Sequence, residues 1–210
     1  MGLVVRFDER KDVVWTMNPK TGNATRNKPR KTDSEIEVCA QCHSRRSSIS
    51  QDYVPGKPFM DHYVPSLLVD GLYHADGQID DEVYVYGSFL QSKMYAAGVI
   101  CSDCHNAHTA ELRDQGNGLC TQCHSEEGNP RFPTLSLRAY DTPAHHFHKS
   151  ESTGASCVEC HMPETTYMEV DPRRDHSLRI PRPDLSVKLG VPNACTRCHL
   201  TDAEVPDEVR

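Results

Sequence analysis

Apolar residues occur along this chain in short runs, and few runs are long enough to predict a regular element. Two strand-like pieces lie near the start, residues 3–7 (LVVRF) and residues 12–17 (DVVWTM), with charged residues between them. Residues 82–98 (EVYVYGSFLQSKMYAAG) form the one substantial helix candidate, and Gly98 predicts where that helix ends. Residues 172–192 are punctuated by proline, which predicts an extended segment. We expect the remaining stretches to form long irregular connections.

The overall composition is too polar to supply an ordinary apolar core. Hydrophobic residues make up 37% of the 210 residues and the mean hydropathy is -0.63, whereas soluble domains typically contain roughly 45 to 50% apolar residues. Such a chain buries too little side-chain area to offset the entropy lost on folding, so it is either disordered or organised around a non-protein core. Its ten cysteines favour the second possibility.

The charge pattern narrows the possible partners. The net charge is -7, from 30 acidic and 23 basic residues, and the sequence has no basic stripe interleaved with aromatic residues, so we expect no nucleic-acid partner. No apolar run approaches the roughly 20 residues of a membrane helix, so we expect no transmembrane segment. The apolar patch at the start is too short for a signal peptide. We therefore expect either that an export signal has been removed or that the chain is part of a longer protein.

The ten cysteines form five CxxC pairs, and a histidine directly follows each pair. The cysteines are Cys39 and Cys42, Cys101 and Cys104, Cys120 and Cys123, Cys157 and Cys160, and Cys195 and Cys198. The histidines are His43, His105, His124, His161 and His199. With 12 histidines among 210 residues, five such coincidences have a chance of roughly one in a million, so the repeated pattern needs a chemical explanation.

Three kinds of site use CxxC pairs. Zinc sites take the pairs two at a time, but five pairs do not divide into fours, and zinc needs no histidine after every pair. A thioredoxin-like dithiol needs one pair at the start of a helix that follows a strand, rather than five copies. Covalent haem c attachment is the third kind, and CxxCH marks it. On one helical turn the two thiols form thioethers with the vinyl groups of one porphyrin, and the histidine is the proximal ligand of the iron.

Five CxxCH motifs predict five covalently attached haems c. The porphyrins provide apolar faces that the side chains do not supply, which resolves the unusual composition. We therefore predict a multihaem cytochrome c fold, mainly α with much irregular structure and little β-sheet, organised around a chain of covalently bound haems. Residues 1–38 are expected to form an N-terminal strand-like lobe, and residues 39–210 a pentahaem cytochrome c domain.

Seven further histidines are candidates for the distal position on the five irons. His108 lies three residues after His105 and cannot reach the far side of its own porphyrin, so we expect it to bind a neighbouring iron. His176 ends the stretch RRDH, far enough from the fourth motif for the chain to wrap round to another haem. The six methionines are interpreted as packing or surface residues. Bis-histidine ligation with low reduction potentials is therefore the prediction.

The other distal candidates differ in their sequence context. The stretch HHFH supplies three histidines in four residues, of which two suffice as iron ligands while the third can donate to a propionate; they are His145, His146 and His148. His74 follows a short amphipathic run and precedes turn residues, which suits a rigidly presented side chain. His62 has the weakest support of the seven.

The spacing of the motifs predicts closely packed haems. Successive motifs begin 62, 19, 37 and 38 residues apart, so the second and third haems are expected to be close neighbours. A globule of 210 residues has a radius of gyration of about 17 Å, which places evenly spread haem centres only about 20 Å apart. Electrons can then hop along the chain of haems.

Five stretches around the motifs carry a family pattern. They are LYHADGQIDDEVYVYGSFLQSKMYAAGVICSDCHNAHT, YDTPAHHFH, CVECHMPETTYM, VDPRRDHSLRIPRPDLSVKLG and PNACTRCH, within residues 35–200. Together they resemble the haem-rich part of large bacterial multihaem cytochromes c that continue into tetratricopeptide repeats. The CHMP … DH pattern is also similar to the lineage of cytochrome c nitrite reductase and hydroxylamine oxidoreductase. The resemblance implies that His74, His108, His176 and the HHFH histidines match ligand positions.

Two features depart from the family pattern. Family members usually carry further CxxCH motifs upstream and helical repeats downstream, and this sequence has neither. In the nitrite reductase lineage a lysine replaces the motif histidine at the catalytic haem, whereas all five motifs here end in histidine. The second departure argues against the same active site.

These observations together predict electron transfer, either as a carrier or as a subunit of an extracellular conductive assembly. The alternative is a multihaem oxidoreductase that acts on a small nitrogen or sulfur compound at one five-coordinate haem. Covalent haem attachment predicts a periplasmic or extracellular location. The expected partners are redox proteins and copies of the chain itself in an end-to-end haem array.

Overall fold

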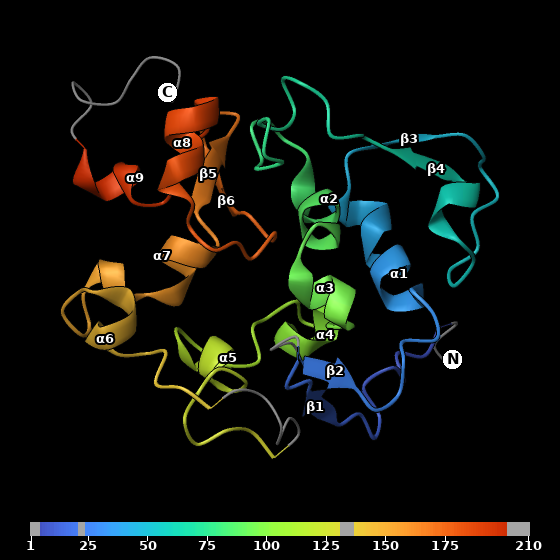
Figure 1. The fold of residues 1–210 in the computed structure, drawn as a ribbon. Coiled ribbons are helices and arrows are strands. Elements are labelled where there is room, and N and C mark those ends of the chain that lie inside the picture. The colour runs from blue at the N-terminus through green and yellow to red at the C-terminus, as the bar shows by residue number, and fades with distance from the viewer. Residues whose placement is uncertain (1–4, 21–23, 131–136, 201–210) are drawn as a thin grey trace.

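Short helices joined by long irregular stretches make up most of the protein, as Figure 1 shows for the computed structural model. The structure describes residues 5–20, 24–130 and 137–200. The α-helices are α1 (Ser34–His43), α2 (Tyr84–Leu90), α3 (Lys93–Ala97), α4 (Cys101–Cys104), α5 (Gly118–Thr121), α6 (Pro143–His146), α7 (Cys157–His161), α8 (Pro183–Leu189) and α9 (Thr196–His199). Two 3-10 turns cover Phe59–Asp61 and Thr153–Ala155.

Among the described residues, the strands form three separate two-stranded antiparallel sheets. They are β1 (Trp15–Met17) with β2 (Ala24–Arg26), β3 (Arg46–Ser48) with β4 (Tyr63–Pro65), and β5 (Glu164–Tyr167) with β6 (Asp171–Arg174). The registers pair Trp15 with Arg26, Arg46 with Pro65, and Glu164 with Arg174. Because each sheet has only two strands, none of them forms a layer on which helices could pack.

The larger apolar core lies between α1, α2 and the 3-10 turn at Phe59–Asp61. Its buried members are Ile36, Ala40, Phe59, Tyr86, Phe89 and Ile100. Positions 36 and 40 are one helical turn apart, so α1 presents them on the same face. The Phe59 ring is fully buried and stacks on Tyr63, with 5.0 Å between the ring centroids. A second, smaller cluster joins the segment before α2 to β5 through Tyr73, Ile79, Val83 and Tyr167.

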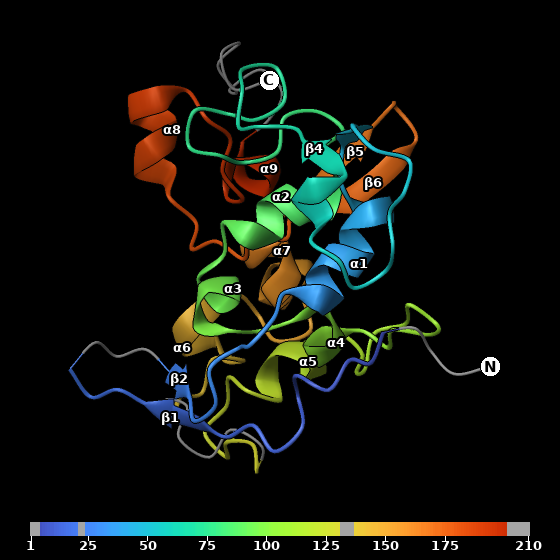
Figure 2. The ribbon, with the colours of Figure 1, turned by 90° about the vertical axis from the view of Figure 1, so that its right-hand side faces the viewer.

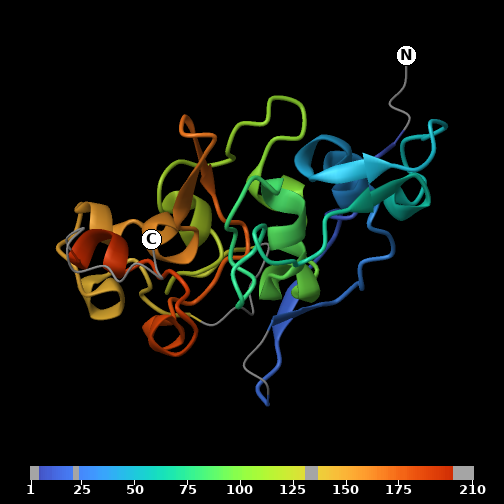
Figure 3. The ribbon, with the colours of Figure 1, turned by 90° about the horizontal axis from the view of Figure 1, so that it is seen from above.

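The two ends of the described chain lie on opposite sides of the molecule. Figures 1 and 3 show α1, β3 and β4 on one side, α7, α8 and α9 on the other, and α2 and α3 between them. Figure 2 shows the β1–β2 hairpin at the lower edge, away from α8 and α9. Within the described part of residues 101–200, the buried hydrophobic residues are Ala155, Tyr167 and Val191. The described part of the chain after residue 100, which carries four of the five motifs, therefore has hardly any core made of side chains.

The helix expected over residues 82–98 occurs as two shorter helices, α2 and α3. Ser92 separates them, because its backbone is extended and its hydroxyl accepts the Tyr95 N–H at 3.0 Å as an N-cap. The predicted end at Gly98 is confirmed, since this residue caps α3 with a φ of 100° in the left-handed region that glycine tolerates.

Within the extended segment expected over residues 172–192, residues 172–174 belong to strand β6. Residues 183–189 form α8 instead, because Pro183 suits a first helical turn, where its fixed φ and its missing N–H cost nothing. Gly190 then ends the helix with a φ of 71°. Of the two strand-like pieces at the start, residues 15–17 form β1 and residues 5–7 form no strand, while residues 3–4 lie outside the described residues.

Helix α1 runs across residue 38, where we expected the N-terminal lobe to end. Arg30 of that lobe donates to the carbonyl oxygen of Tyr95 in α3 at 2.9 Å and stacks on its ring at 4.2 Å. The division at residue 38 stays a prediction. Among residues 5–20, 24–130 and 137–200, no helix has the length and apolarity needed to cross a membrane.

Candidate functional site

Each CxxCH motif lies on one short helical turn. The motifs fall at the end of α1, on α4, across the end of α5 and the turn after it, on α7, and on α9 with the residue before it. In the second, third and fifth motifs the histidine N–H donates to the carbonyl oxygen of the first cysteine, at 2.9, 2.9 and 3.0 Å. This i to i+4 bond closes the turn and brings the two thiols to one side of it. All ten cysteines are free thiols, so each turn offers two thiols and one imidazole.

Cysteines of the first two motifs touch one another. The hydrogen bond between the Cys39 and Cys101 thiols lowers the pKa of Cys39 and raises that of Cys101. Burial raises the pKa of Cys104, the second cysteine of the second motif, to about 11. The first and second motifs are therefore direct neighbours, although 62 residues separate their starts.

The remaining motifs also lie near one another in chain order. The hydrogen bond from Cys157 lowers the pKa of Cys120, against burial and the nearby Cys104 thiol, which both raise it. The pKa of Cys160 is raised by burial first, and also by Cys195 and Cys198. The second motif thus neighbours the third, the third touches the fourth, and the fourth neighbours the fifth. The five motifs form one continuous row.

Three motif histidines each face one histidine from outside the motifs. The ring centroids of His105 and His176 lie 6.4 Å apart with 24° between the planes. His161 and His145 are 6.2 Å apart and nearly parallel, at 8°. Two imidazoles on opposite sides of one metal, with metal–nitrogen bonds of about 2.0 Å, place their ring centroids about 6 Å apart. The observed separations match that distance.

The third pair is His199 with His148. Their ring centroids are 5.7 Å apart, and the two Nε2 atoms lie 3.4 Å from each other. Two nitrogens bound to one metal are about 4 Å apart, so this pair needs only a small outward movement to hold an iron. The predicted candidates His145, His148 and His176 are thus brought opposite motif histidines.

Backbone carbonyl oxygens hold the Nδ1 atoms of His105, His161 and His176. His161 Nδ1 lies 2.7 Å from the Arg179 carbonyl oxygen, and His176 Nδ1 lies 2.8 Å from that of Arg174. His105 Nδ1 lies 3.3 Å from the Ala110 carbonyl oxygen. A carbonyl can only accept, so Nδ1 carries the proton and the Nε2 lone pair is free to bind a metal. Burial also lowers the pKa of His176, which favours the neutral form that metal binding requires.

Two motif histidines, His43 and His124, have no such partner ring among the described residues. His124 instead contacts Tyr140 edge-on at 5.6 Å between ring centroids. His43 is exposed at the end of α1, and its charge contributes to lowering the pKa of His176, so it lies near that residue. The structure therefore brings three of the five motif histidines into imidazole pairs.

The other four candidate histidines form no ring pair with a motif histidine in the described part of the chain. His74 Nε2 is 3.5 Å from an Asp80 carboxylate oxygen. The His62 ring packs edge-on against Tyr53 at 5.4 Å, and its buried Nδ1 has no hydrogen-bond partner in the described part of the chain. His146 accepts the His148 N–H at 3.1 Å. His108 is exposed and lines a cavity beside α1 and α4.

The arrangement fits covalent haem better than a zinc site. Among residues 5–20, 24–130 and 137–200, no three histidine, cysteine or acidic side chains converge as metal ligands. A structural zinc ion needs four such ligands around one point. Free thiol pairs on single turns and opposed imidazoles suit a porphyrin, because the pair binds at its edge and the imidazoles on its two faces. The chain therefore offers the donor set that haem c requires.

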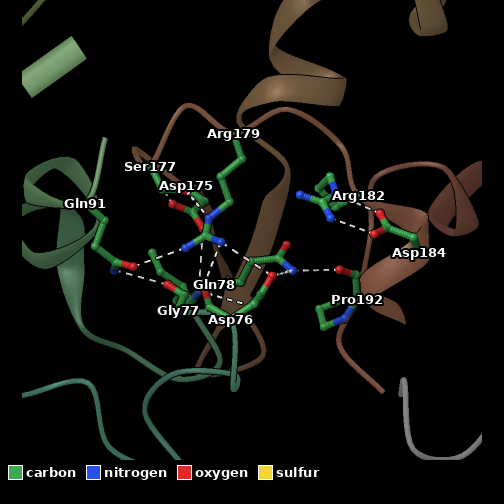
Figure 4. A network of polar contacts seen from close by, with 11 residues as sticks. Asp76, Gly77, Gln78, Gln91, Asp175, Ser177, Arg179, Arg182, Asp184 and Pro192 are labelled. Carbon is green, nitrogen blue, oxygen red and sulfur yellow. Dashed lines mark hydrogen bonds and ion pairs between the residues drawn. The ribbon is translucent and has the colours of Figure 1, made fainter. Parts of the chain in front are cut away.

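One positioning network was not expected from the sequence, and it centres on Arg179 (Figure 4). The Arg179 carbonyl oxygen accepts a hydrogen bond from His161 Nδ1, and the backbone N–H of Arg179 donates to the His161 carbonyl oxygen at 3.0 Å. Its guanidinium donates to the carbonyl oxygen of Asp76 at 2.8 Å, to Gln91 Oε1 at 3.1 Å and to Ser177 Oγ at 2.8 Å. This network ties the fourth motif to the segment before α2. The sequence gives no signal for it, because backbone carbonyls take part in three of these five contacts.

A second unexpected contact joins the first two motifs. The buried Glu35 carboxylate of α1 accepts the Ser102 N–H at 2.6 Å and the Ser102 hydroxyl at 2.9 Å. Ser102 lies inside the second motif, between Cys101 and Cys104. Burial raises the pKa of Glu35, and the two hydrogen bonds oppose this effect. An acidic residue in the first turn of a helix ordinarily indicates only favourable charge, so this role was not predictable.

Comparison with known proteins agrees with this geometry. A family model described as the doubled CXXCH motif matches residues 93–129, which contain the second and third motifs. No curated protein matches the chain. The crystal structure of the outer cell wall cytochrome OcwA is similar, with a TM-score of 0.55 and 20% sequence identity over 90% of this chain and 52% of OcwA. The chain thus spans about half the length of OcwA.

The fold-class prediction is confirmed by this likeness. Both the irregular course of the chain and its short helices and small sheets are those of a multihaem cytochrome such as OcwA. The doubled CXXCH motif indicates covalently bound c-type haem. The chain therefore has the fold of a multihaem c-type cytochrome.

Proposed function

We propose that this protein transfers electrons along a row of five closely packed c-type haems, one on each CxxCH motif. The observation that carries the proposal is the proximity of successive motifs, from the Cys39–Cys101 thiol pair to Cys160 and Cys195. Haem supplies a one-electron iron centre when it is bound. Because the anchoring turns are neighbours throughout the row, the attached porphyrins lie edge to edge or nearly so.

The residues of the chain have distinct parts in this proposal. The ten motif cysteines anchor the porphyrins, and the five motif histidines are proximal ligands. His176, His145 and His148 are the distal ligands opposite His105, His161 and His199, as supported by the ring separations. His74, His108 and His146, and with less support His62, are the candidates for the irons of the first and third motifs. Carbonyl oxygens at Nδ1 orient the imidazoles and make them stronger ligands.

The proposed setting is the periplasm or the cell exterior. Covalent haem and the likeness to an outer cell wall cytochrome support it. There the protein acts as a carrier or as a subunit of an extracellular conductive assembly, with redox proteins or copies of itself as partners. The link to cytochromes fused to tetratricopeptide repeats, and to the nitrite reductase lineage, rests on the quoted sequence stretches. The division into a lobe at residues 1–38 and a pentahaem domain belongs to the same proposal.

A second function is favoured by one observation at the first motif. His43 is exposed and no imidazole ring pairs with it in the described part of the chain. An iron there with one open face would allow the protein to act as an oxidoreductase on a small nitrogen or sulfur compound. A high-spin haem that binds nitrite or hydroxylamine supports this function, and five low-spin haems support the carrier.

Interrupting the row at different places tests the proposed function. Replacing Cys120 and Cys123 by alanine removes the middle anchor, whereas replacing Cys195 and Cys198 removes a terminal one. Each double variant should lose one haem of about 0.6 kDa in intact mass. After flash photoreduction, the middle variant should redistribute electrons among its haems at least tenfold more slowly than the terminal variant. Equal rates in the two variants would contradict a linear row.

A further inference from the structure

Tyr140 lies between histidines that belong to two neighbouring haem sites of the row. Its ring packs edge-on against His124 of the third motif, with 5.6 Å between the ring centroids and 87° between the planes. The same ring packs edge-on against His145, at 5.2 Å and 90°. His145 in turn faces His161 of the fourth motif. One tyrosine therefore contacts an imidazole from the third site and an imidazole from the fourth.

Both contacts have the geometry that aromatic rings prefer. The positive edge of one ring meets the negative face of another when the rings are roughly perpendicular and their centroids lie about 4.5 to 7 Å apart. An imidazole that turned about its side-chain bonds would leave this geometry. Because Tyr140 makes two such contacts, its ring restrains the planes of His124 and His145 together.

Ring packing holds these two imidazoles in place of hydrogen bonds. In the described part of the chain, the ring nitrogens of His124 and His145 have no hydrogen-bond partner. Three other histidines of the row are held at Nδ1 by carbonyl oxygens, and they are His105, His161 and His176. Outer contacts of this kind fix the orientation of a ligand imidazole and tune its metal. For His124 and His145, the Tyr140 ring supplies the outer contact.

The backbone on both sides of Tyr140 is tied to the third motif. The Arg138 N–H donates to the carbonyl oxygen of Ser125, the residue after that motif, at 3.3 Å. Asn117, which precedes α5, donates from Nδ2 to Asp141 Oδ1 at 2.8 Å. Tyr140 therefore follows the third motif closely, although it lies outside it in the sequence.

Asn117 also ties this stretch to the fourth motif. Its Oδ1 accepts the Cys157 N–H at 2.9 Å, and its Nδ2 donates to the Ala155 carbonyl oxygen at 2.9 Å. Its own carbonyl oxygen accepts the Cys120 N–H at 2.9 Å. The two motifs and the segment that carries Tyr140 are thus joined through one side chain, which gives the Tyr140 ring a fixed place between them.

We propose that Tyr140 is a positioning residue for electron transfer between the third and fourth haems. Its ring fixes the imidazole planes of His124 and His145, and so tunes both irons. In each transfer one iron is oxidised and the other is reduced by one electron, while Tyr140 itself is unchanged. The inference rests on the proposed function, because it needs a haem on each of these motifs. The Tyr140 hydroxyl has no hydrogen-bond partner in the described part of the chain, so the ring carries the effect.

Electron paramagnetic resonance of the oxidised holoprotein tests this role, because the g-values of a low-spin haem depend on the planes of its axial imidazoles. Tyr140→Leu should shift the signals of two haems, and it should slow electron exchange between the third and fourth haems severalfold after flash photoreduction. Tyr140→Phe keeps the ring and should behave as the wild type does. Tyr84→Leu is the matched control, since Tyr84 is also half-buried and packs on no motif histidine in the described part of the chain.

Two anchor variants identify the haems. The signal that disappears when Cys120 and Cys123 are replaced by alanine belongs to the third haem. The signal that disappears when Cys157 and Cys160 are replaced belongs to the fourth. Shifts confined to these two signals support the proposal. Unchanged signals in Tyr140→Leu, equal shifts in every haem, or a Tyr140→Phe variant that behaves like Tyr140→Leu would overturn it.

A further measurement needs no variant. In the reduced holoprotein, whose low-spin haems are diamagnetic, nuclear Overhauser effects should link the Tyr140 ring protons to both His124 and His145. Their absence would overturn the proposal even if Tyr140→Leu did not fold. Intact mass of the same samples counts the covalent haems, so a failure of the proposed five-haem function is recognised separately.

Discussion

The described chain is held together in different ways before and after residue 100. The earlier part packs apolar side chains around Phe59, between α1 and α2. The later part carries four of the five motifs, yet its buried hydrophobic residues are only Ala155, Tyr167 and Val191. Polar networks such as that of Arg179 and close contacts between motif thiols take the place of an apolar core there. The comparison indicates where side chains organise the fold and where haem does.

Preventing haem attachment should have the largest effect, and mostly on residues 101–200. Without the cofactor this part lacks apolar surface to bury, so its amides should exchange close to the unfolded rate. The amides of α1 and α2 should keep more protection, because their core consists of side chains. Hydrogen-exchange mass spectrometry of protein produced with and without cytochrome c maturation measures both parts. Equal loss of protection before and after residue 100 would contradict the claim that the two parts are stabilised in different ways.

Truncating the apolar core should have the next largest effect. Phe59→Ala removes a ring that is 0% exposed, and such changes typically cost about 3 to 5 kcal/mol in the free energy of unfolding. Leu67→Ala is the control, since Leu67 is 72% exposed and should change the free energy of unfolding by about 0.5 kcal/mol or less. Guanidinium denaturation of the holoproteins, followed by far-ultraviolet circular dichroism, gives both values. Similar losses for the two variants would show that this cluster is not a core.

Removing the Arg179 guanidinium should weaken the part after residue 100 by a smaller amount. Arg179→Ala breaks the bonds to Asp76, Gln91 and Ser177, at a cost of about 1 to 3 kcal/mol in the free energy of unfolding. The bond to His161 comes from the backbone, so it should loosen rather than disappear. Arg182→Ala is the matched control, because Arg182 is an exposed arginine whose ion-pair partner in the described part of the chain is Asp184. The two variants should therefore differ in denaturation midpoint, and an unchanged midpoint for Arg179→Ala would exclude a structural role.

The smallest expected effect is a change in the pH dependence of stability. Burial raises the pKa of Glu35 above its ordinary value of 4.5, so the folded state binds the proton more tightly than the unfolded state. The contribution of Glu35 to stability is therefore full below about pH 4.5 and is lost as the pH rises through its folded pKa. Glu35→Gln should remove the contribution of Glu35 to the slope of the free energy of unfolding against pH, between about pH 4 and pH 7. Parallel stability curves for wild type and variant would show that Glu35 is not perturbed.

The same division explains what the sequence could predict. The motif cysteines and histidines were recognisable because covalent haem attachment imposes a fixed local spacing. Gly98 was recognisable as a helix end because left-handed backbone favours glycine. The split between α2 and α3 was missed because apolar residues occur on both sides of Ser92. The apolar pattern does not reveal that the Ser92 hydroxyl caps a new helix. Helix α8 was missed because proline indicates an extended segment as readily as a first helical turn.

Contacts between distant segments were beyond local patterns altogether. The pairing of His161 with His145, rather than with another candidate, depends on how α6 and α7 pack. The bonds from Ser102 to Glu35 and from His161 to the Arg179 carbonyl join residues 67 and 18 positions apart. Neither contact has a periodicity that could reveal it in the sequence.

Counting the covalent haems on the purified protein tests the central claim most directly. Intact mass combined with thiol titration under denaturing conditions should show five additions of about 0.6 kDa and no free thiol, because all ten cysteines are expected to form thioethers. A colourless protein of 23.6 kDa in which all ten thiols titrate would contradict a fold organised by haem.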